Sequence, residues 1–222
     1  MDNNKDIFVT EPILPPLEDC MPMIRQIWNS KQLTNHGPLV KQFEESLKSY
    51  LGAKHLSVVN NATTGLMIAQ KALNFRGEVI TTPFSFVATA HSINWLGLKP
   101  VFVDTDKNHG NLDPEKVEGA INKQTGGILA CHNFGFPSEV EKLAEISKKY
   151  KIPLIFDGAP AVGVRYKEKS ITEYGDACIL SFHATKIFTT LEGGAVISRS
   201  QGTKDRIDQL RNFNIRNEQE VG

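Results

Sequence analysis

One stretch of the sequence combines a lysine with small and hydroxylated residues. Ser181-Phe182-His183-Ala184-Thr185-Lys186 follows the apolar run Ala177–Leu180 and precedes Glu192-Gly193-Gly194-Ala195. A lysine buried in such a turn loses proton affinity through desolvation, and a neutral amine can attack a carbonyl carbon to form a Schiff base. Lys186 is therefore a candidate nucleophile. The alternative, which is the commoner case for any single lysine, is a solvated surface side chain.

Other residues carry chemistry that would complement such a lysine. The turn Asn60–Gly65 has small residues where a helix begins, so its backbone N–H groups can approach a phosphate. Asp157 ends an apolar strand and, once buried, needs a positive partner such as a pyridinium nitrogen. Phe86 can offer a flat face to an aromatic ring. His183, close to the lysine, is a candidate catalytic group.

Each of these residues also has a purely structural interpretation. Asn and Thr in the turn are favoured as N-caps of any helix. Asp157 can cap the next turn, and Phe86 can pack in the core of the protein. His183 can be a packed, hydrogen-bonded histidine. Only the joint arrangement can decide between the two sets of interpretations.

The elements that would position these residues alternate between strands and helices from Gly37 onward. Apolar runs predict strands at residues 56–59, 79–81, 101–104, 128–132, 154–157, 178–182 and 195–198. Helical spacing predicts helices at 43–51, 62–73, 85–96, 114–122 and 138–150, the last with capping-box spacing between Ser138 and Glu141. This order predicts an α/β fold, a three-layer sandwich with a mainly parallel central sheet.

The candidate residues follow the predicted strands, at the edge of the sheet where ligands bind in such folds. Asn60–Gly65, Pro83–Phe86, Asp157 and Ser181–Lys186 each come directly after a strand. A phosphate-binding turn, an aromatic residue, an acid for a ring nitrogen and a lysine occur in that order. Together they describe a site for pyridoxal 5'-phosphate.

Composition excludes several other classes of function. The 222 residues carry 25 basic and 25 acidic side chains, so no net field favours nucleic acid or an anionic membrane. The apolar runs are too short to span a bilayer, and the polar N-terminus has no signal-peptide core. Cys20, Cys131 and Cys178 show no ligand or disulfide pattern, which predicts reduced thiols, no metal site and a cytoplasmic protein.

No linker is present, so we expect an irregular N-terminal arm over 1–36 and one domain over 37–222.

Several motifs in a fixed order resemble the DegT-type sugar aminotransferases, fold-type I enzymes that aminate nucleotide-linked keto-sugars. The resemblance runs from about Leu33 to Asn214. It rests on Thr34-Asn35-His36-Gly37-Pro38-Leu39-Val40 with Phe43-Glu44, Pro83-Phe84-Ser85-Phe86-Val87-Ala88-Thr89, His132 with Gly135 and Pro137, Asp157 with Ala159 and Gly163, and Ser181–Lys186 with Glu192-Gly193-Gly194.

The resemblance implies a role for each matched position. Lys186 would hold the cofactor and then move the proton between substrate and cofactor, and Asp157 would keep the ring nitrogen protonated. Phe86 would stack on the ring, and the phosphate would be bound by Ala62, Thr63 and Ser181. The family implies pyridoxal 5'-phosphate, a nucleotide-sugar substrate, an amino-acid donor that is commonly glutamate, and a homodimer. It also implies that the chain is the large, cofactor-binding domain of the fold.

The sequence departs from the family pattern at three points. Pro160 stands where a glutamine or histidine usually contacts the cofactor, and proline offers neither a polar side chain nor an N–H. Asn61-Ala62-Thr63 replaces the usual serine-glycine-threonine. The smaller C-terminal domain of the family is expected to be missing after Gly222. The alternative hypothesis is therefore a truncated, non-catalytic homologue, or half of a split enzyme. A dehydrogenase is disfavoured because no Gly-x-Gly-x-x-Gly follows the first strand.

Overall fold

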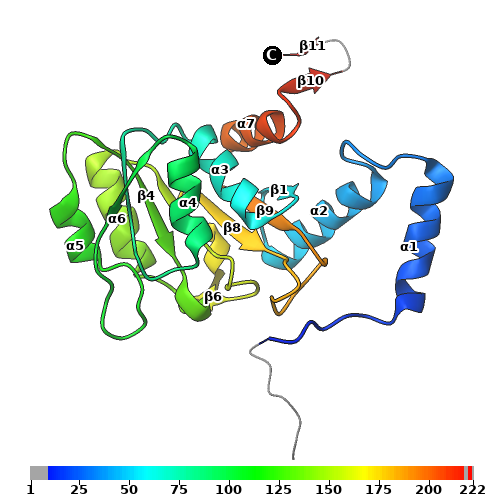
Figure 1. Ribbon diagram of the computed structural model, residues 1–222, viewed down its shortest axis with the longest axis horizontal. Helices are drawn as coiled ribbons and strands as arrows, with labels where there is room; N and C mark the ends of the chain where they lie inside the picture. Colours follow the sequence, from blue (N-terminus) through cyan, green and yellow to red (C-terminus); the bar gives the residue numbers. More distant parts are fainter. Residues whose placement is uncertain (1–9, 218–219, 222) are drawn as a thin grey trace, which may run out of the picture.

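The structure is a computed structural model that describes residues 10–217 and 220–221. Its centre is a seven-stranded sheet with the strand order β1-β9-β8-β5-β4-β2-β3 (Figure 1). Strand β9 runs antiparallel to both of its neighbours, and the strands from β8 to β3 pair in parallel. The strands are β1 (His55–Val59), β2 (Glu78–Thr81), β3 (Lys99–Phe102), β4 (Thr125–Cys131), β5 (Leu154–Asp157), β8 (Ala177–Ser181) and β9 (Gly194–Ser198).

Helices cover both faces of the sheet, and each face has its own hydrophobic core. One core joins the sheet to α2, α5 and α6, and the other joins it to α3, α4 and α7. This confirms the predicted three-layer α/β sandwich with a mainly parallel sheet. The helices are α1 (Leu17–Ser30), α2 (Pro38–Leu51), α3 (Ala62–Ala72), α4 (Val87–Trp95), α5 (Pro114–Ala120), α6 (Val140–Tyr150) and α7 (Gln201–Arg211).

Alternation along the buried strands decides which face each side chain reaches. In β5, Leu154 and Phe156 join the core of α2, α5 and α6, whereas Ile155 joins the core of α3, α4 and α7. The two-residue period of a strand therefore puts Asp157, the last residue of β5, on the side of α3 and α4. The acid is thus placed beside the helices that begin at the phosphate-binding turn and at Phe86.

Helix α3 packs unusually close to the sheet because of Gly65. A Cβ atom at this position would lie 3.3 Å from side-chain carbons of Val59, Ile179 and Val196, which belong to three neighbouring strands. The contact fixes the first turn of α3 directly above the ends of β1 and β8. The start of this helix is therefore positioned by backbone packing as well as by its cap.

The remaining elements are short. Two small hairpins pair β6 (Arg165–Tyr166) with β7 (Lys169–Ser170), and β10 (Ile215–Asn217) with β11 (Glu220–Val221). Single 3₁₀ turns occur at Asn133–Gly135 and Ile171–Glu173. Within the described residues, every helix is too short or too polar to cross a membrane.

The expectation of an irregular N-terminal arm is wrong for much of its length. Residues Leu17–Ser30 form α1, which has no buried residue and lies apart from the sheet (Figure 1). Its exposed apolar side chains Leu17, Met21, Ile24 and Trp28 recur at helical spacing. Pro22 lies inside this helix, and the proline masked the pattern in the sequence because proline usually interrupts helices.

The predicted capping box at Ser138 is also wrong. Helix α6 begins at Val140, and its N-cap Glu139 makes no side-chain cap bond. Ser138 is buried, where its Oγ donates to the Cys131 carbonyl at 2.9 Å and its amide donates to His132 Nδ1 at 3.1 Å. The hydroxyl therefore satisfies a buried backbone group at the end of β4 instead of capping the helix.

Candidate active site

The ends of four neighbouring strands bring the predicted site residues to one edge of the sheet. Cys131 at the end of β4 pairs with Asp157, and Ser181 at the end of β8 pairs with Gly194 at the start of β9. Gly194 in turn pairs with Val59, the last residue of β1. The turns that follow these strands are therefore neighbours, although their residues are far apart in the sequence.

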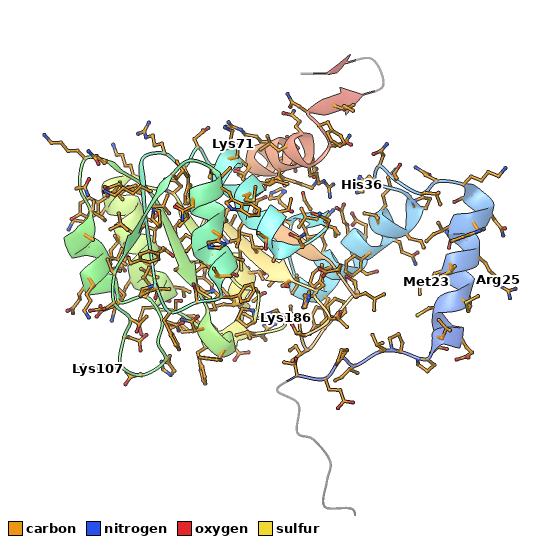
Figure 2. All side chains as sticks on the ribbon, viewed as in Figure 1. Met23, Arg25, His36, Lys71, Lys107 and Lys186 are labelled. Carbon is orange, nitrogen blue, oxygen red and sulfur yellow. The ribbon has the colours of Figure 1, made fainter. Side chains whose placement is uncertain are left out.

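A cavity of about 360 Å³ opens at this edge and collects three of the predicted residues. Phe86, Asp157 and Lys186 all line it. Figure 2 labels Lys186 in the connection between β8 and β9. The cavity is completed by Pro83, Phe84, Ser85, Cys131, Asn133, Phe134, Ala159 and Pro160.

The acid of this cavity is deeply buried and has few partners. Asp157 is 4% exposed, its Oδ2 accepts a 2.8 Å bond from Thr89 Oγ1, and its Oδ1 accepts a 3.1 Å bond from the Ala159 amide. Burial raises the pKa of Asp157, against the two hydrogen bonds and the positive charge of Lys186. Among the described residues no salt bridge reaches this carboxylate. A cation entering the cavity would therefore be attracted to it.

The lysine is less buried than the small and apolar residues around it in the sequence led us to expect. Lys186 is half-buried, in a turn that its amide closes by donating to the His183 carbonyl at 2.9 Å. His183 is exposed, and its Nδ1 accepts a 3.2 Å bond from the Thr185 amide. Its Nε2 lies 3.5 Å from Glu192 Oε1. The histidine thus shapes the turn that carries the lysine.

Phe86 is available to a ligand because it is not part of the core. It is the N-cap residue of α4 and is 76% exposed. The neighbouring rings of Phe84 and Phe134 lie 6.0 Å apart, centroid to centroid, at the same cavity. Asn133 ties their loops together, because its Nδ2 donates to the carbonyls of Phe84 at 2.9 Å and Gly110 at 2.6 Å.

The predicted phosphate-binding turn lies outside this cavity, and its residues Asn60 and Thr64 line a second, larger one. Asn61 Oδ1 accepts a 2.8 Å bond from the Thr64 amide, so the turn does contain an N-cap. The cap does not bond the amides of Ala62 and Thr63. These first amides of the helix also have no partner inside it. Gly194 allows close approach, since a Cβ there would lie 2.9 Å from the Ala62 nitrogen. Ala62, Thr63 and Ser181 do not line the 360 Å³ cavity.

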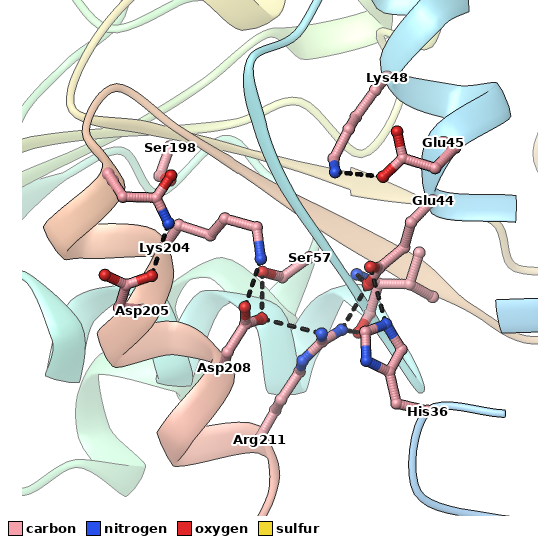
Figure 3. A network of polar contacts seen from close by, with 12 residues as sticks. His36, Glu44, Glu45, Lys48, Ser57, Ser198, Lys204, Asp205, Asp208 and Arg211 are labelled. Carbon is pink, nitrogen blue, oxygen red and sulfur yellow. Dashed lines mark hydrogen bonds and ion pairs between the residues drawn. The ribbon is translucent and has the colours of Figure 1, made fainter. Parts of the chain in front are cut away.

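A larger cavity, of about 1020 Å³, lies between α7 and the loop before α2 and contains neither Asp157 nor Lys186. Three of its charged or titratable lining residues, His36, Asp208 and Arg211, belong to one ion-pair network with Glu44. Arg211 contacts Glu44 at 2.6 Å and Asp208 at 2.8 Å, and His36 contacts Glu44 at 2.8 Å (Figure 3). We therefore locate the chemistry in the smaller cavity, where a buried acid has no such partners.

Comparison with known proteins places this chain in a family. The model of the DegT/DnrJ/EryC1/StrS aminotransferase family matches residues 17–221. The chain belongs to this family. Its resemblance at the sequence level is thereby confirmed, and the α/β fold with a mainly parallel sheet is shared with solved structures of sugar aminotransferases.

Several relatives of the chain are named sugar transaminases. The dTDP-4-amino-4,6-dideoxy-D-glucose transaminase of Shigella dysenteriae is 46% identical over 94% of this chain and 57% of the relative. The structure of DesI in the presence of its TDP-sugar product superposes with a TM-score of 0.93 at 34% identity, over 96% of this chain and 54% of DesI. The chain thus spans about half the length of the curated relatives it matches.

At least one solved structure with this fold was determined with a bound cofactor. NtdA from Bacillus subtilis, with bound cofactor PMP, has a TM-score of 0.85 and 25% identity over 99% of this chain and 53% of NtdA. The residues of the present chain fit a group of this kind. The underpaired carboxylate of Asp157 suits a protonated ring nitrogen, the exposed ring of Phe86 suits an aromatic face, and the first amides of α3 suit a phosphate.

Three site residues were not assigned from the sequence. Thr89 and Asn133 have no spacing signal of their own, because a threonine inside a helix and an asparagine after a strand are common. Their roles depend on partners 68 and 49 residues away. Pro160, noted as a departure from the family pattern, does line the cavity and adds only apolar surface there. Within the described residues no group of acidic, histidine or cysteine side chains could hold a metal ion.

Proposed function

We propose that this chain is the cofactor-binding part of a pyridoxal-phosphate-dependent aminotransferase that acts on a nucleotide-linked keto-sugar. The buried, underpaired Asp157, which lines the same cavity as Lys186, is the observation that carries the proposal. The family membership and the transaminases among its relatives support the reaction class. Glutamate is proposed as the amino donor, and amino-sugar or polysaccharide biosynthesis as the setting.

Each site residue has a distinct part in this function. Asp157 would bind the ring nitrogen and hold a proton there, while Phe86 covers one face of the ring. Ala62 and Thr63 would bind the phosphate through their amides and the threonine hydroxyl, with Ser181 as a further donor. When bound, pyridoxal phosphate supplies an electron-withdrawing ring and a carbonyl that can accept an amino group. Lys186 Nζ would take the proton from the substrate carbon and return it.

The proposal includes a second copy of the chain. The rings of Phe84, Phe86 and Phe134 are half or more exposed at the cavity mouth, and Ile187 and Leu191 are exposed in the connection between β8 and β9. Large exposed apolar surface of this kind marks interaction sites. We propose a homodimer that covers this rim. The thiols of Cys20, Cys131 and Cys178 form no disulfide, and two of them are buried, which fits a reducing compartment. We therefore place the protein in the cytoplasm.

Spectroscopy of the purified chain tests the cofactor proposal. Adding pyridoxal phosphate should produce the long-wavelength absorbance band of a lysine-bound cofactor, and Lys186→Ala should abolish it. Lys204→Ala is a matched control, since that lysine pairs with Asp208 away from the cavity. A wild-type chain without this band, or a Lys186→Ala chain that keeps it, would refute the assignment.

The chain covers only a little more than half the length of its relatives, and this favours one alternative. In this alternative the chain binds cofactor but transfers no amine unless a second polypeptide provides the remaining length. Amine transfer from glutamate to a nucleotide keto-sugar by the chain alone would exclude it. Cofactor binding without transfer, restored by adding the C-terminal part of a relative, would establish it.

A further inference from the structure

A buried series of hydrogen bonds leads from α3 through α4 to the acid of the site. Gln70 Nε2 donates to Ser92 Oγ, Ser92 Oγ donates to the Thr89 carbonyl, and Thr89 Oγ1 donates to Asp157 Oδ2, each at 2.8 Å. Gln70, Ser92 and Thr89 are fully buried. Polar groups in such an interior are costly unless paired, so this arrangement demands an explanation beyond filling space.

Thr89 connects two parts of the candidate site. Its amide donates to the Phe86 carbonyl at 3.1 Å, and its side chain donates to Asp157. The second oxygen of Asp157 is held by the Ala159 amide. The carboxylate is thus fixed at both oxygens, from α4 on one side and from the turn after β5 on the other, while it lines the cavity.

We propose that Thr89 is a positioning residue whose hydroxyl orients the Asp157 carboxylate and favours its charged form for binding the ring nitrogen of the cofactor. This inference rests on the proposed function. It adds a residue that acts through Asp157 and does not itself line the cavity. Ser92 and Gln70 support it by holding the turn of α4 that carries Thr89.

The electrostatic surroundings of Asp157 explain why one hydroxyl matters. The charged group that acts on it is Lys186 in the connection between β8 and β9, and the titratable groups beside it are the thiols of Cys131 on β4 and Cys178 on β8, whose pKa values Asp157 helps to raise. Burial raises the pKa of Asp157, and the Thr89 hydrogen bond is the largest influence in the opposite direction. Without that donor, a larger fraction of Asp157 would be in the neutral, protonated form. A neutral acid binds a protonated ring nitrogen less well.

The glutamine at the far end of the series is informative because it is incompletely satisfied. Gln70 Oε1 is buried and has no hydrogen-bond partner within the described residues. A buried polar group of this kind adds little stability, and an apolar residue of similar size is often tolerated as well or better. The amide is therefore better explained by what its Nε2 holds, which is Ser92 Oγ at 2.8 Å and, in its own helix, the Leu66 carbonyl at 3.2 Å.

Three substitutions test the role of the hydroxyl. Thr89→Val keeps the shape of the side chain and removes the donor, Thr89→Ser keeps the donor, and Thr89→Ala is a second removal in case the valine variant does not fold. Thr81→Val is a matched control, because Thr81 is equally buried and donates to the Leu129 carbonyl at 2.8 Å without touching Asp157.

The first readout needs no cofactor. The carboxyl carbon of Asp157 is titrated by NMR in chains labelled with ¹³C-aspartate and assigned with Asp157→Asn. The pKa of Asp157 should rise in Thr89→Val and Thr89→Ala and stay at the wild-type value in Thr89→Ser and Thr81→Val. An unchanged pKa in both variants that lack the donor would overturn the proposal.

The second readout is the affinity for pyridoxal phosphate. Removal of the hydroxyl should weaken binding by about tenfold to a hundredfold, the range expected for one hydrogen bond to a charged group. Thr89→Ser should restore wild-type affinity. Wild-type affinity in Thr89→Val would refute the role of Thr89 alone, whereas a wild-type chain that binds no pyridoxal phosphate would refute the proposed function and this inference with it.

Discussion

Two carboxylates in this protein are equally buried and have opposite electrostatic surroundings. Glu44 on α2 and Asp157 on β5 are each 4% exposed. Burial alone would raise the pKa of both. For Glu44 the Val58 amide, Arg211 and His36 outweigh burial, and the pKa is lowered. For Asp157 the two hydrogen bonds and the charge of Lys186 do not outweigh burial, and the pKa is raised.

The surroundings of Glu44 form a closed network. Arg211 bridges Glu44 and Asp208 and also donates to the Val58 carbonyl, so it fastens α7 to α2 and β1 (Figure 3). Asp208 accepts further bonds from Ser57 and Lys204. Every charge here has a partner within the chain, which is the arrangement of a structural site.

The comparison teaches how to separate a structural acid from a functional one at equal depth. A buried charge that the protein has already neutralised holds the fold together. A buried charge that the protein leaves underpaired is destabilising on its own, and such a position is understandable where a ligand completes it. The following predictions test this distinction.

Glu44→Gln should have the largest effect on stability. It leaves Arg211 buried with only part of its partners, and breaking a buried ion pair on one side costs about 3 kcal/mol. Urea unfolding of the wild-type chain and of the Glu44→Gln variant measures the difference in the free energy of unfolding. Glu45→Gln, at an exposed neighbour in the same helix, is the control and should change stability by less than about 0.5 kcal/mol. Equal losses in both variants would contradict a structural role for the network.

His132 extends the comparison to a buried base without a charged partner. Burial lowers the pKa of His132 to about 3, and its Nε2 has no partner in the described structure. The unfolded chain binds a proton near pH 6.5 and the folded chain does not, so stability is complete above pH 6.5 and falls as the pH drops toward 3. The loss between pH 6.5 and 5 should be about 2 kcal/mol.

Urea unfolding at several pH values checks this prediction. His132→Gln should remove most of the dependence in that window, while Glu44 does not contribute there because its pKa lies below its ordinary value of 4.5. A variant that keeps the full slope would mean that another group is responsible.

Asp157→Asn should behave in the opposite way to Glu44→Gln. Because the folded pKa of Asp157 is raised, its contribution to stability is full below the unfolded pKa and is lost as the pH rises through the folded pKa. At neutral pH the chain without cofactor should therefore be unchanged or more stable, by about 1 kcal/mol. The same variant should bind pyridoxal phosphate more weakly. A clear loss of stability without cofactor would make Asp157 a structural acid like Glu44.

Phe86→Ala should have the smallest effect on the fold. An exposed ring contributes little to stability, so thermal unfolding should change by less than about 0.5 kcal/mol. Binding of pyridoxal phosphate should weaken by about tenfold, the upper range for an aromatic contact. Phe86→Tyr should keep the affinity. If alanine binds cofactor as well as the wild type, the ring does not cover it.

The sequence predicted those parts of the molecule that follow from local periodicity. Buried strands read as apolar runs, and the residues after them fall at one edge of a parallel sheet, which is how Phe86, Asp157 and Lys186 could be expected near one another. The small residues at the start of a helix suggested the phosphate-binding turn, and the family resemblance added the individual roles of Ala62, Thr63 and Ser181. Ends of elements were less accurate, as Ser138 shows, because a hydroxyl can serve a buried carbonyl instead of a helix.

Contacts between distant segments could not be predicted in this way. The Thr89 hydroxyl and the Arg211 guanidinium meet their carboxylates across 68 and 167 residues, and no spacing rule connects them. Whether a buried acid is matched or underpaired depends on such contacts. The distinction between Glu44 and Asp157 therefore appears only in three dimensions.

The antiparallel β9 has a consequence for how the chain folds. Among the strands that the structure describes, the edge strand β1 pairs with β9 alone, with His55 opposite Ser198. The first strand of the sheet in the sequence therefore cannot pair until the last one is available. During synthesis at about 5–20 residues per second, β1 would stay unpaired for roughly ten seconds or longer. Such a topology has many contacts between distant residues and folds slowly. The growing chain is thus most exposed to aggregation before Gly194–Ser198 emerges from the ribosome, and slower translation before that point would prolong the risk.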